Sequence, residues 1–428
     1  MTAIADHPRS LLLARLRDPA RWMATVDIVA VLLALTLPWS TSLVGILGVV
    51  MVLAMLPVLD AGSLARLLKQ PIAAAPVALF LLALAGTLWS DAAWGARLYA
   101  VGPTAKLLVL PFLFQHFQRS ERGLWVFIAF LASCALMVVM SWIVAFFPGL
   151  TLKAKDVASH GIFVKNYIDQ SQEFALFAVA LAYPVVMLAR AGRVALAVVL
   201  CALALAFVSN MAFVIVSRTA LVTMPIMLGV FGLLHLRWRT TLLILCVAAI
   251  AGGIAWMASP QLQGTVHKFK SDYQSYMEEG ANTSIGERLE YYKKSLHFFA
   301  EAPLKGHGTG STRALFEQAA SGAAAGSAAA EVVGNPHNQT LNVAVQWGVI
   351  GVVLLYAMWL SHLMLFRGEG LINWIGLLVV VQNIFTSLFN SHIFDFHEGW
   401  MYVMGVGVAG GMVLKAGAAK RTDIVGVS

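Results

Sequence analysis

The chain of 428 residues is 60% hydrophobic and only 12% charged, about half the charged share of an ordinary soluble domain. This composition excludes a soluble globular enzyme and predicts a polytopic membrane protein. The net charge of +8 does not indicate nucleic-acid binding, because the lysines and arginines are concentrated in short loops between apolar segments, and we expect no nucleic-acid partner.

Apolar runs that are long enough to cross a bilayer as helices recur along the chain. We therefore predict an all-α polytopic fold with about twelve transmembrane helices. Residues 1–258 would hold the first nine helices, residues 259–340 one large loop with amphipathic helices, and residues 341–428 the last three helices and a tail. The expected spans are 22–39, 42–58, 71–90, 98–117, 124–147, 171–189, 194–217, 219–236, 240–257, 341–366, 371–390 and 396–414.

The distribution of lysine and arginine among the short loops predicts the orientation of these helices. Placing both termini in the cytoplasm puts most of the loop cations on the cytoplasmic side. The 259–340 loop then lies outside, where neither ATP nor cytosolic nucleotide sugars are present, so a substrate there must carry its own leaving group. A shorter outer loop, 148–170, contains Lys165 and is expected to be solvated and to face lipid headgroups, with a role in substrate binding as the alternative.

Arg218 lies in Ser217-Arg-Thr-Ala220, between two long apolar runs at the outer face. An arginine that extends from a helix end to the interface is one explanation. However, its surroundings are apolar, and no acidic residue lies nearby in the sequence to pair with it. A charge in such a setting indicates a functional site, and we favour that interpretation. Lys106, also inside an apolar run, is open to both interpretations.

An amphipathic helix is expected within the large loop. Ser284-Ile-Gly-Glu287 has the pattern of a capping box, which predicts a helix that starts at Ser284 and ends before Pro303. Arg288 lies off the apolar stripe of this helix, close to Tyr291 and Ser295 at spacings of 3 and 4, and a solvated face is one explanation for this arginine. The expected buried stripe consists of apolar residues at helical spacing, namely Ile285, Leu289, Tyr292, Leu296 and Phe299.

Two glycine-rich or small-residue stretches follow this helix. Lys305-Gly-His-Gly-Thr-Gly-Ser-Thr312 has alternating glycines, which permit a ligand to approach the backbone N–H groups. It lacks the Gly-Lys-Ser/Thr end of a Walker loop, so the signal is weak. Residues 321–330 contain little that can be buried and are expected to form a lid or a plain linker.

The segment Asn335-Pro-His-Asn338 ends the large loop. Asn335 is expected to cap a helix whose first turn contains Pro336, His337 and Asn338. The field at a helix N-terminus disfavours an imidazolium ion, so His337 should be neutral and available as a base. A histidine that merely anchors the start of the helix is the alternative.

A second polar cluster is expected at the outer end of the last two spans. It contains His392, Asp395, His397 and Glu398, which could suggest a metal site. We expect a polar turn instead, in which Asp395 orients His337 or an arginine.

Several of these segments, in this order, resemble the bacterial O-antigen ligase and polymerase superfamily. The resemblance implies a GT-C-like glycosyltransferase in the bacterial inner membrane with a periplasmic active site. The segments are Ser217-Arg218, Arg288-Leu-Glu-Tyr-Tyr292, Pro303-Leu-Lys-Gly-His-Gly-Thr-Gly310, Pro336-His-Asn-Gln-Thr-Leu341 and Gln346-Trp-Gly-Val-Ile-Gly351; Thr87-Leu-Trp-Ser90 is also similar.

In a ligase of this superfamily, the donor is an undecaprenyl-pyrophosphate-linked glycan and the acceptor is lipid A–core oligosaccharide. The resemblance assigns the essential arginines to Arg218 and Arg288 and the loop histidine to His337. We expect an inverting displacement with His337 as the base and both arginines on the pyrophosphate, without a metal or other cofactor. Asn338, Tyr291 and Asp395 are candidate supporting residues.

Three other functions remain open. An O-antigen polymerase and a protein O-oligosaccharyltransferase would use the same donor with a different acceptor; a single dominant outer loop favours the ligase. A transporter of lipid-linked glycans would require discontinuous spans and polar groups at mid-membrane, for which Gln346, Gln382 and Asn383 are the candidates. The sugars, the acceptor position and the oligomeric state are not determined by the sequence.

Overall fold

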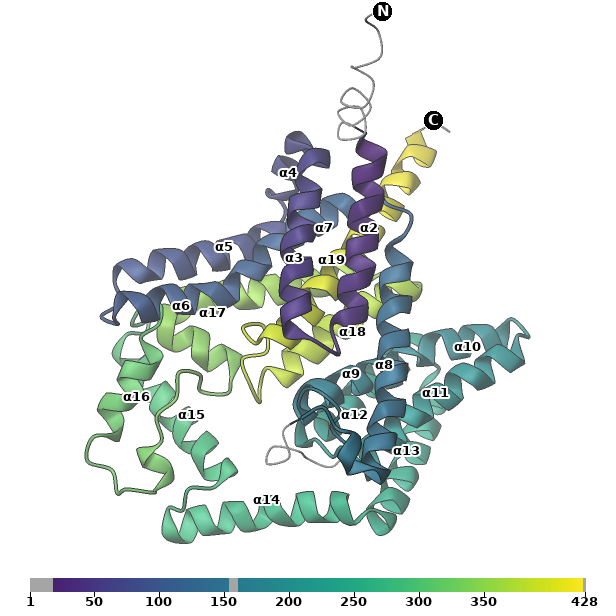
Figure 1. Ribbon diagram of the computed structural model, residues 1–428. Coiled ribbons are helices and arrows are strands. Elements are labelled where there is room, and N and C mark those ends of the chain that lie inside the picture. Colours follow the sequence, from purple (N-terminus) through teal and green to yellow (C-terminus); the bar gives the residue numbers. More distant parts are fainter. Residues whose placement is uncertain (1–17, 154–160, 426–428) are drawn as a thin grey trace, which may run out of the picture.

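The computed structural model describes residues 18–153 and 161–425 (Figure 1). Within these residues the chain is almost entirely helical, and a single antiparallel bridge joins Ala281 and Ser327. Eleven helical segments are long and apolar enough to cross a membrane. The predicted all-α polytopic fold is therefore confirmed.

The eleventh predicted span, 371–390, corresponds to a helix of only 16 residues, Leu371–Thr386, which ends four residues before the expected boundary. Two other spans, Trp94–Phe117 and Tyr167–Arg190, each contain two α-helices in succession. The helices are α2 (Pro19–Thr36), α3 (Thr41–Met55), α4 (Ala61–Leu67), α5 (Pro71–Ala85), α6 (Trp94–Ala105), α7 (Val109–Phe117), α8 (Gly123–Phe146), α9 (Tyr167–Ala180), α10 (Ala182–Arg190), α11 (Val194–Phe213), α12 (Arg218–His235), α13 (Trp238–Ala258), α14 (Pro260–Glu279), α15 (Ser284–Glu301), α16 (Thr312–Ala320), α17 (Gln339–Leu365), α18 (Leu371–Thr386) and α19 (Phe396–Val425).

Small residues bring the central helices of the bundle close together. On α19, a Cβ atom at Gly407, Gly410 or Gly411 would lie only 2.4–2.6 Å from side-chain atoms of α7. Helices in a membrane associate mainly through such close packing, because lipid is as apolar as the side chains themselves. The glycines of α19 therefore fix its position along α7.

Helices α14, α15 and α16 lie together at the end of the bundle opposite to the start of α2 and the end of α19, and α14 runs crosswise there (Figure 1). Helices α15 and α16 share a small apolar core, made of Tyr291, Phe298 and Phe316 with Val345 from α17, and α14 is joined to α15 by the hydrogen bond from Tyr276 to Glu290. The large polar loop is thus a folded helical unit that rests on α17.

Helix α15 differs from its prediction in its cap and its buried face. It begins at Ser284 and ends at Glu301, but the residue that caps it is Thr283, whose hydroxyl accepts a hydrogen bond from the N–H of Gly286 at 3.1 Å. Tyr291 and Ser295 are buried, whereas Leu289 and Leu296 of the predicted stripe are exposed. Ile285 of that stripe is buried, so the stripe predicted the buried face only in part, and the packing of Tyr291 and Phe298 on Phe316 buries another side of α15 as well.

The glycine-rich loop has a structural role in place of the expected ligand contact. Helix α17 is interrupted at Gly348, which has φ 58° and ψ −154°. The loop pairs with the backbone groups at this break: the N–H of His307 donates to Val345 O at 2.9 Å, and that of Gly308 to Gln346 O at 2.8 Å. In return, Val349 donates to Pro303 O at 2.8 Å. The prediction that these N–H groups face a ligand was therefore wrong.

We expect Gly308→Ala to destabilise the protein strongly. Gly308 has φ +88°, and a Cβ atom there would lie 2.5 Å from the Cα of Ser90. The left-handed backbone costs an alanine about 1–2 kcal/mol, and the clash should add about 1–3 kcal/mol. Thermal unfolding of the purified protein in detergent measures this. Gly322→Ala is the control, since Gly322 has φ +104° but no atom within 4 Å; equal losses in both variants would contradict the role of packing.

Candidate functional site

The segment that contains His337 is a loop held against the connection between α18 and α19. Helix α17 begins at Gln339, and its cap is Asn338, whose Oδ1 accepts from the N–H of Leu341 at 3.0 Å. The prediction that Asn335 caps this helix was therefore wrong, because Asn335 Oδ1 instead accepts from the N–H of His337 at 2.9 Å and from the hydroxyl of Ser391 at 2.7 Å. His337 consequently lies before the helix and outside its first turn.

His337 has a strained backbone. Its φ of 54° is the one positive value among the non-glycine residues that the structure describes. This conformation costs about 1–2 kcal/mol and persists only where the surroundings enforce it. The bond to Asn335 supplies part of this constraint, and the ring of Tyr291 stacks on the imidazole with centroids 5.9 Å apart. Strain of this kind is typical of functional positions.

Asn390 fixes the protonation state of the imidazole. Its Oδ1 lies 2.9 Å from His337 Nδ1, and its Nδ2 donates to Asp395 Oδ2 at 2.6 Å. Because the amide NH₂ group faces the carboxylate, the amide oxygen must face the ring, so Nδ1 carries the proton. His337 Nε2 is then left with a free lone pair. Asp395 thus reaches His337 through Asn390, and its orienting role stays a prediction.

Electrostatics favour a neutral His337. Burial lowers the pKa of His337, the bond to Asn390 opposes this shift, and the charges of Arg288 and His392 lower the pKa further. The pKa of His337 is lowered, as expected from the sequence. The main cause is burial and not the field of a helix N-terminus, because His337 lies before the helix. Burial, together with the charge of Glu398, raises the pKa of Asp395 to about 7.

Arg288 and Tyr291 reach this place from α15. Arg288 lies near enough to influence the pKa of His337, and Tyr291 is 3% exposed beneath the imidazole. Burial raises the pKa of Tyr291 to about 12, so its hydroxyl stays protonated. Tyr291 thus contacts the His337 ring directly and Asp395 reaches it through Asn390, whereas Arg288 acts on it through its charge. Asn338 is adjacent, but its side chain serves as the helix cap.

Arg218 lies apart from this cluster. It is the first residue of α12, and its Nη2 atom is 3.3 Å from Asp272 Oδ2 on α14. The guanidinium group also lies 5.8 Å from the ring centre of Phe269. Among the described residues, no hydrogen bond or ion pair joins Arg218 to Arg288 or His337. The acidic partner that is missing nearby in the sequence thus comes from 54 residues further along the chain.

A groove of about 1220 Å³ is lined in part by residues that also support His337. Its long walls come from the apolar faces of α3 and α6, including Val49, Leu53 and Tyr99. Its polar end contains Asn335 and Asp395, which also hold His337. The groove therefore joins an apolar surface to the polar cluster.

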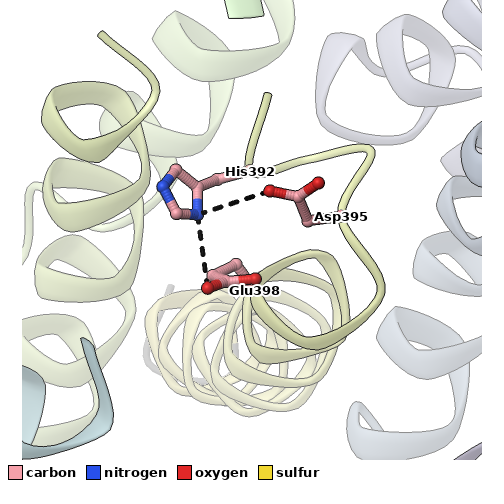
Figure 2. A group of neighbouring side chains, drawn as sticks. All are labelled: His392, Asp395 and Glu398. Atoms are coloured by element: carbon pink, nitrogen blue, oxygen red, sulfur yellow. Dashed lines mark ion pairs between the residues drawn. The ribbon is translucent and has the colours of Figure 1, made fainter. Parts of the chain in front are cut away.

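His392, Asp395 and Glu398 form the group that could hold a metal ion (Figure 2). Their donor atoms lie within 4.8 Å of one another, and His392 Nδ1 is 3.5 Å from Glu398 Oε1 and 3.9 Å from Asp395 Oδ2. The donor types suit a small divalent cation. However, the ammonium group of Lys106 donates to the backbone oxygens of Phe394 and Asp395 and already supplies a positive charge. The expectation of a metal-free site stays a prediction.

The described part of the 148–170 loop is less solvated than predicted. Lys165 Nζ lies 2.8 Å from His397 Nδ1, and His397 Nε2 lies 2.9 Å from Glu173 Oε1. His397 and Glu173 are both buried. Lys165 thus ties the loop to α9 and α19 rather than facing headgroups; of the loop, residues 154–160 lie outside the described residues.

Asn390 is the residue of this site that the sequence analysis missed. The expected span 371–390 placed Asn390 inside the membrane, whereas α18 ends at Thr386 and residues 387–395 form the loop that supports His337. The polar run Asn390-Ser-His392 was the one signal that could have revealed an earlier helix end.

Comparison with known proteins identifies a related family. Residues 203–356 match the family model described as O-antigen ligase, a segment that contains Arg218, Arg288 and His337. An uncharacterized protein of Haemophilus influenzae is 29% identical over 156 residues, which are 35% of this chain and 39% of that protein. The match thus spans well under half of the relative's length.

Proposed function

We propose, from the membership in the O-antigen ligase and polymerase superfamily that the match over residues 203–356 supports, that this protein is an O-antigen ligase. It transfers a glycan from undecaprenyl pyrophosphate to lipid A–core oligosaccharide at the periplasmic face of the bacterial inner membrane. The observation that carries the proposal is the bond between His337 Nδ1 and Asn390 Oδ1, because it leaves Nε2 as a base beside Arg288.

In the proposed reaction, His337 Nε2 takes the proton of the acceptor hydroxyl group. The acceptor oxygen forms a bond to the anomeric carbon while the bond from that carbon to the pyrophosphate oxygen breaks, which inverts the configuration. Undecaprenyl pyrophosphate leaves with the bonding electron pair. The low pKa of a buried histidine suits this role, since the base must be neutral when the acceptor arrives.

The leaving pyrophosphate gains negative charge and requires fixed cations. Arg288 is placed beside His337 on α15 and is the nearer candidate; Arg218 at the start of α12 is the second. A guanidinium group can hold two phosphate oxygens at once, which an ammonium group cannot. Both arginines are therefore assigned to the pyrophosphate.

The α3–α6 groove supports a lipid-linked substrate. Its apolar walls suit an isoprenyl chain within the membrane, and its polar end reaches Asn335 and Asp395. The position of α14–α16, at the end of the bundle away from the start of α2 and the end of α19, agrees with cytoplasmic termini and a periplasmic site (Figure 1). Membrane lipid, the lipid-linked donor and lipid A–core are thus the proposed partners.

A transporter is the alternative from another class, and it requires discontinuous spans. Helix α17 is discontinuous at Gly348, but the loop 303–310 fills the break. The polar groups at mid-membrane also have partners: Gln346 donates to Asn342 Oδ1 at 2.8 Å, and Asn383 accepts from Trp359 at 3.0 Å. These contacts favour a fixed scaffold over an opening pathway.

Transfer by the purified protein in nanodiscs tests the proposal. The donor is undecaprenyl-pyrophosphate-linked glycan. Three acceptors are offered separately: lipid A–core, glycan repeats carried on undecaprenyl pyrophosphate, and an acceptor peptide. We expect product with lipid A–core only. Product with glycan repeats alone would identify a polymerase, and product with peptide alone a protein O-oligosaccharyltransferase; both outcomes would contradict the ligase.

A further inference from the structure

Arg218 and Asp272 form an ion pair between a membrane helix and the α14–α16 unit. Their side chains are 31% and 12% exposed, and the pair rests on one contact of 3.3 Å. A carboxylate that fully engages an arginine makes two parallel bonds of about 2.7–2.9 Å. Asp272 therefore uses only part of the donor capacity of the guanidinium group.

Arg218 is the first residue of α12, a position at which a nearby anion is especially stabilising for a positive charge. A positive charge at the first residue of a helix is opposed by the helix dipole. The first turn of α12 contains no acidic residue, and Ser217 makes no side-chain capping bond there. Asp272 on α14 is thus the anion that compensates Arg218 in this structure.

Asp272 also connects Arg218 to the helix that carries Arg288. The backbone oxygen of Asp272 accepts a hydrogen bond from the hydroxyl of Thr283 at 2.9 Å, and Thr283 caps α15. One turn further along α14, the hydroxyl of Tyr276 donates to Glu290 on α15 at 2.6 Å. Helices α14 and α15 therefore behave as one unit, which the carboxylate of Asp272 attaches to the start of α12.

We propose that Asp272 occupies the anion position of Arg218 in the substrate-free protein and is displaced by a phosphate group of the lipid-linked donor. The proposal rests on the proposed function, because it takes Arg218 as a pyrophosphate ligand. Displacement exchanges one anion for another, so the charge of Arg218 remains compensated throughout. It also releases the α14–α15 unit, with Arg288, from its attachment to α12. Donor binding is thereby coupled to the position of α15.

The phosphate group has two physical advantages in this exchange. The diphosphate to which it belongs carries two negative charges against the one of a carboxylate, and its oxygens can accept both terminal N–H groups of the arginine. The competing contact is a single, partly exposed one, which is typically weak. Removal of the competitor should therefore strengthen donor binding by about fivefold, the upper limit for an exposed pair.

Binding of undecaprenyl pyrophosphate, without a glycan, to the full-length protein in nanodiscs provides the test. We expect Asp272→Asn to bind about fivefold more tightly than the wild type, and Asp272→Glu, which keeps the charge, to bind like the wild type. Arg218→Ala combined with Asp272→Asn should bind no better than Arg218→Ala alone. Glu121→Gln, which removes the pair with Lys415 elsewhere in the molecule, is the matched control.

Hydrogen exchange gives a second readout. Addition of undecaprenyl pyrophosphate should increase exchange over α14 and the start of α15 in the wild type, and Asp272→Asn should show this increase without the ligand. If a folded Asp272→Asn variant bound undecaprenyl pyrophosphate equally or more weakly than the wild type, the displacement of Asp272 by a phosphate group would be contradicted. The proposed function would remain intact. Failure of the wild type and all variants to bind would contradict the proposed function itself.

Discussion

His337→Ala is expected to reduce the rate of glycan transfer by about 10³-fold while the protein stays folded. The imidazole Nε2 is the base of the proposed reaction, and general base catalysis typically contributes about 10²–10⁴-fold. The ring lies in the loop before α17, stacked on Tyr291 and bonded to Asn390, and takes no part in the packing of the transmembrane helices, so its removal should leave the bundle folded. Initial rates with lipid A–core as acceptor measure the effect.

His297→Ala is the matched control for this substitution. His297 lies on α15 of the same unit, but its side chain is 71% exposed, and its ion partner is Glu301. We expect near wild-type rates for this variant. Full transfer activity in a folded His337→Ala variant would remove the base from the mechanism.

The dependence of the transfer rate on pH distinguishes a catalytic base from a histidine with a structural role only. The pKa of His337 is lowered, so the neutral base is already present below the usual titration range of histidine, and the acid limb should lie at correspondingly low pH. The bond to Asn390 raises this pKa. Asn390→Ala should therefore slow transfer and move the acid limb to still lower pH. A rate that fell equally at every pH would indicate a structural role only.

Arg288→Lys is expected to reduce transfer by about 10²-fold despite the conserved charge. A lysine cannot hold two phosphate oxygens in the planar arrangement of a guanidinium group, and loss of one donor to a developing anion typically costs about 10²–10³-fold. Arg288→Ala should cost more. Arg239→Lys is the control, since Arg239 lies over Trp238 at the start of α13.

The pH profile of Arg288→Ala should shift opposite to that of Asn390→Ala. The charge of Arg288 lowers the pKa of His337, so its removal raises that pKa and moves the acid limb to higher pH. Opposite shifts in the two variants would place both residues around one titrating histidine. Retention of full activity by Arg288→Lys would contradict bidentate binding of the pyrophosphate.

The membrane fold could be predicted from the sequence alone, and the sequence also supplied the candidate site residues. Span length and hydrophobicity are local properties, so the helices were found to within a few residues in most cases. The structure brings Arg288, Tyr291 and His337 together, as their proposed joint role requires. The role of each stays a prediction.

The tertiary structure alone decided what surrounds these residues. Asn335 is a residue type that favours helix caps, and the glycines of loop 305–312 are typical of a ligand-binding loop. In the structure, the polar groups of both form hydrogen bonds with distant parts of the chain. Asn390 lies 53 residues from His337, and Asp272 lies 54 residues from Arg218. Backbone and side-chain hydrogen bonds depend on which distant groups become neighbours. The orientation of the base and the partner of Arg218 were therefore decided by the packing of α14, α15 and the α18–α19 connection.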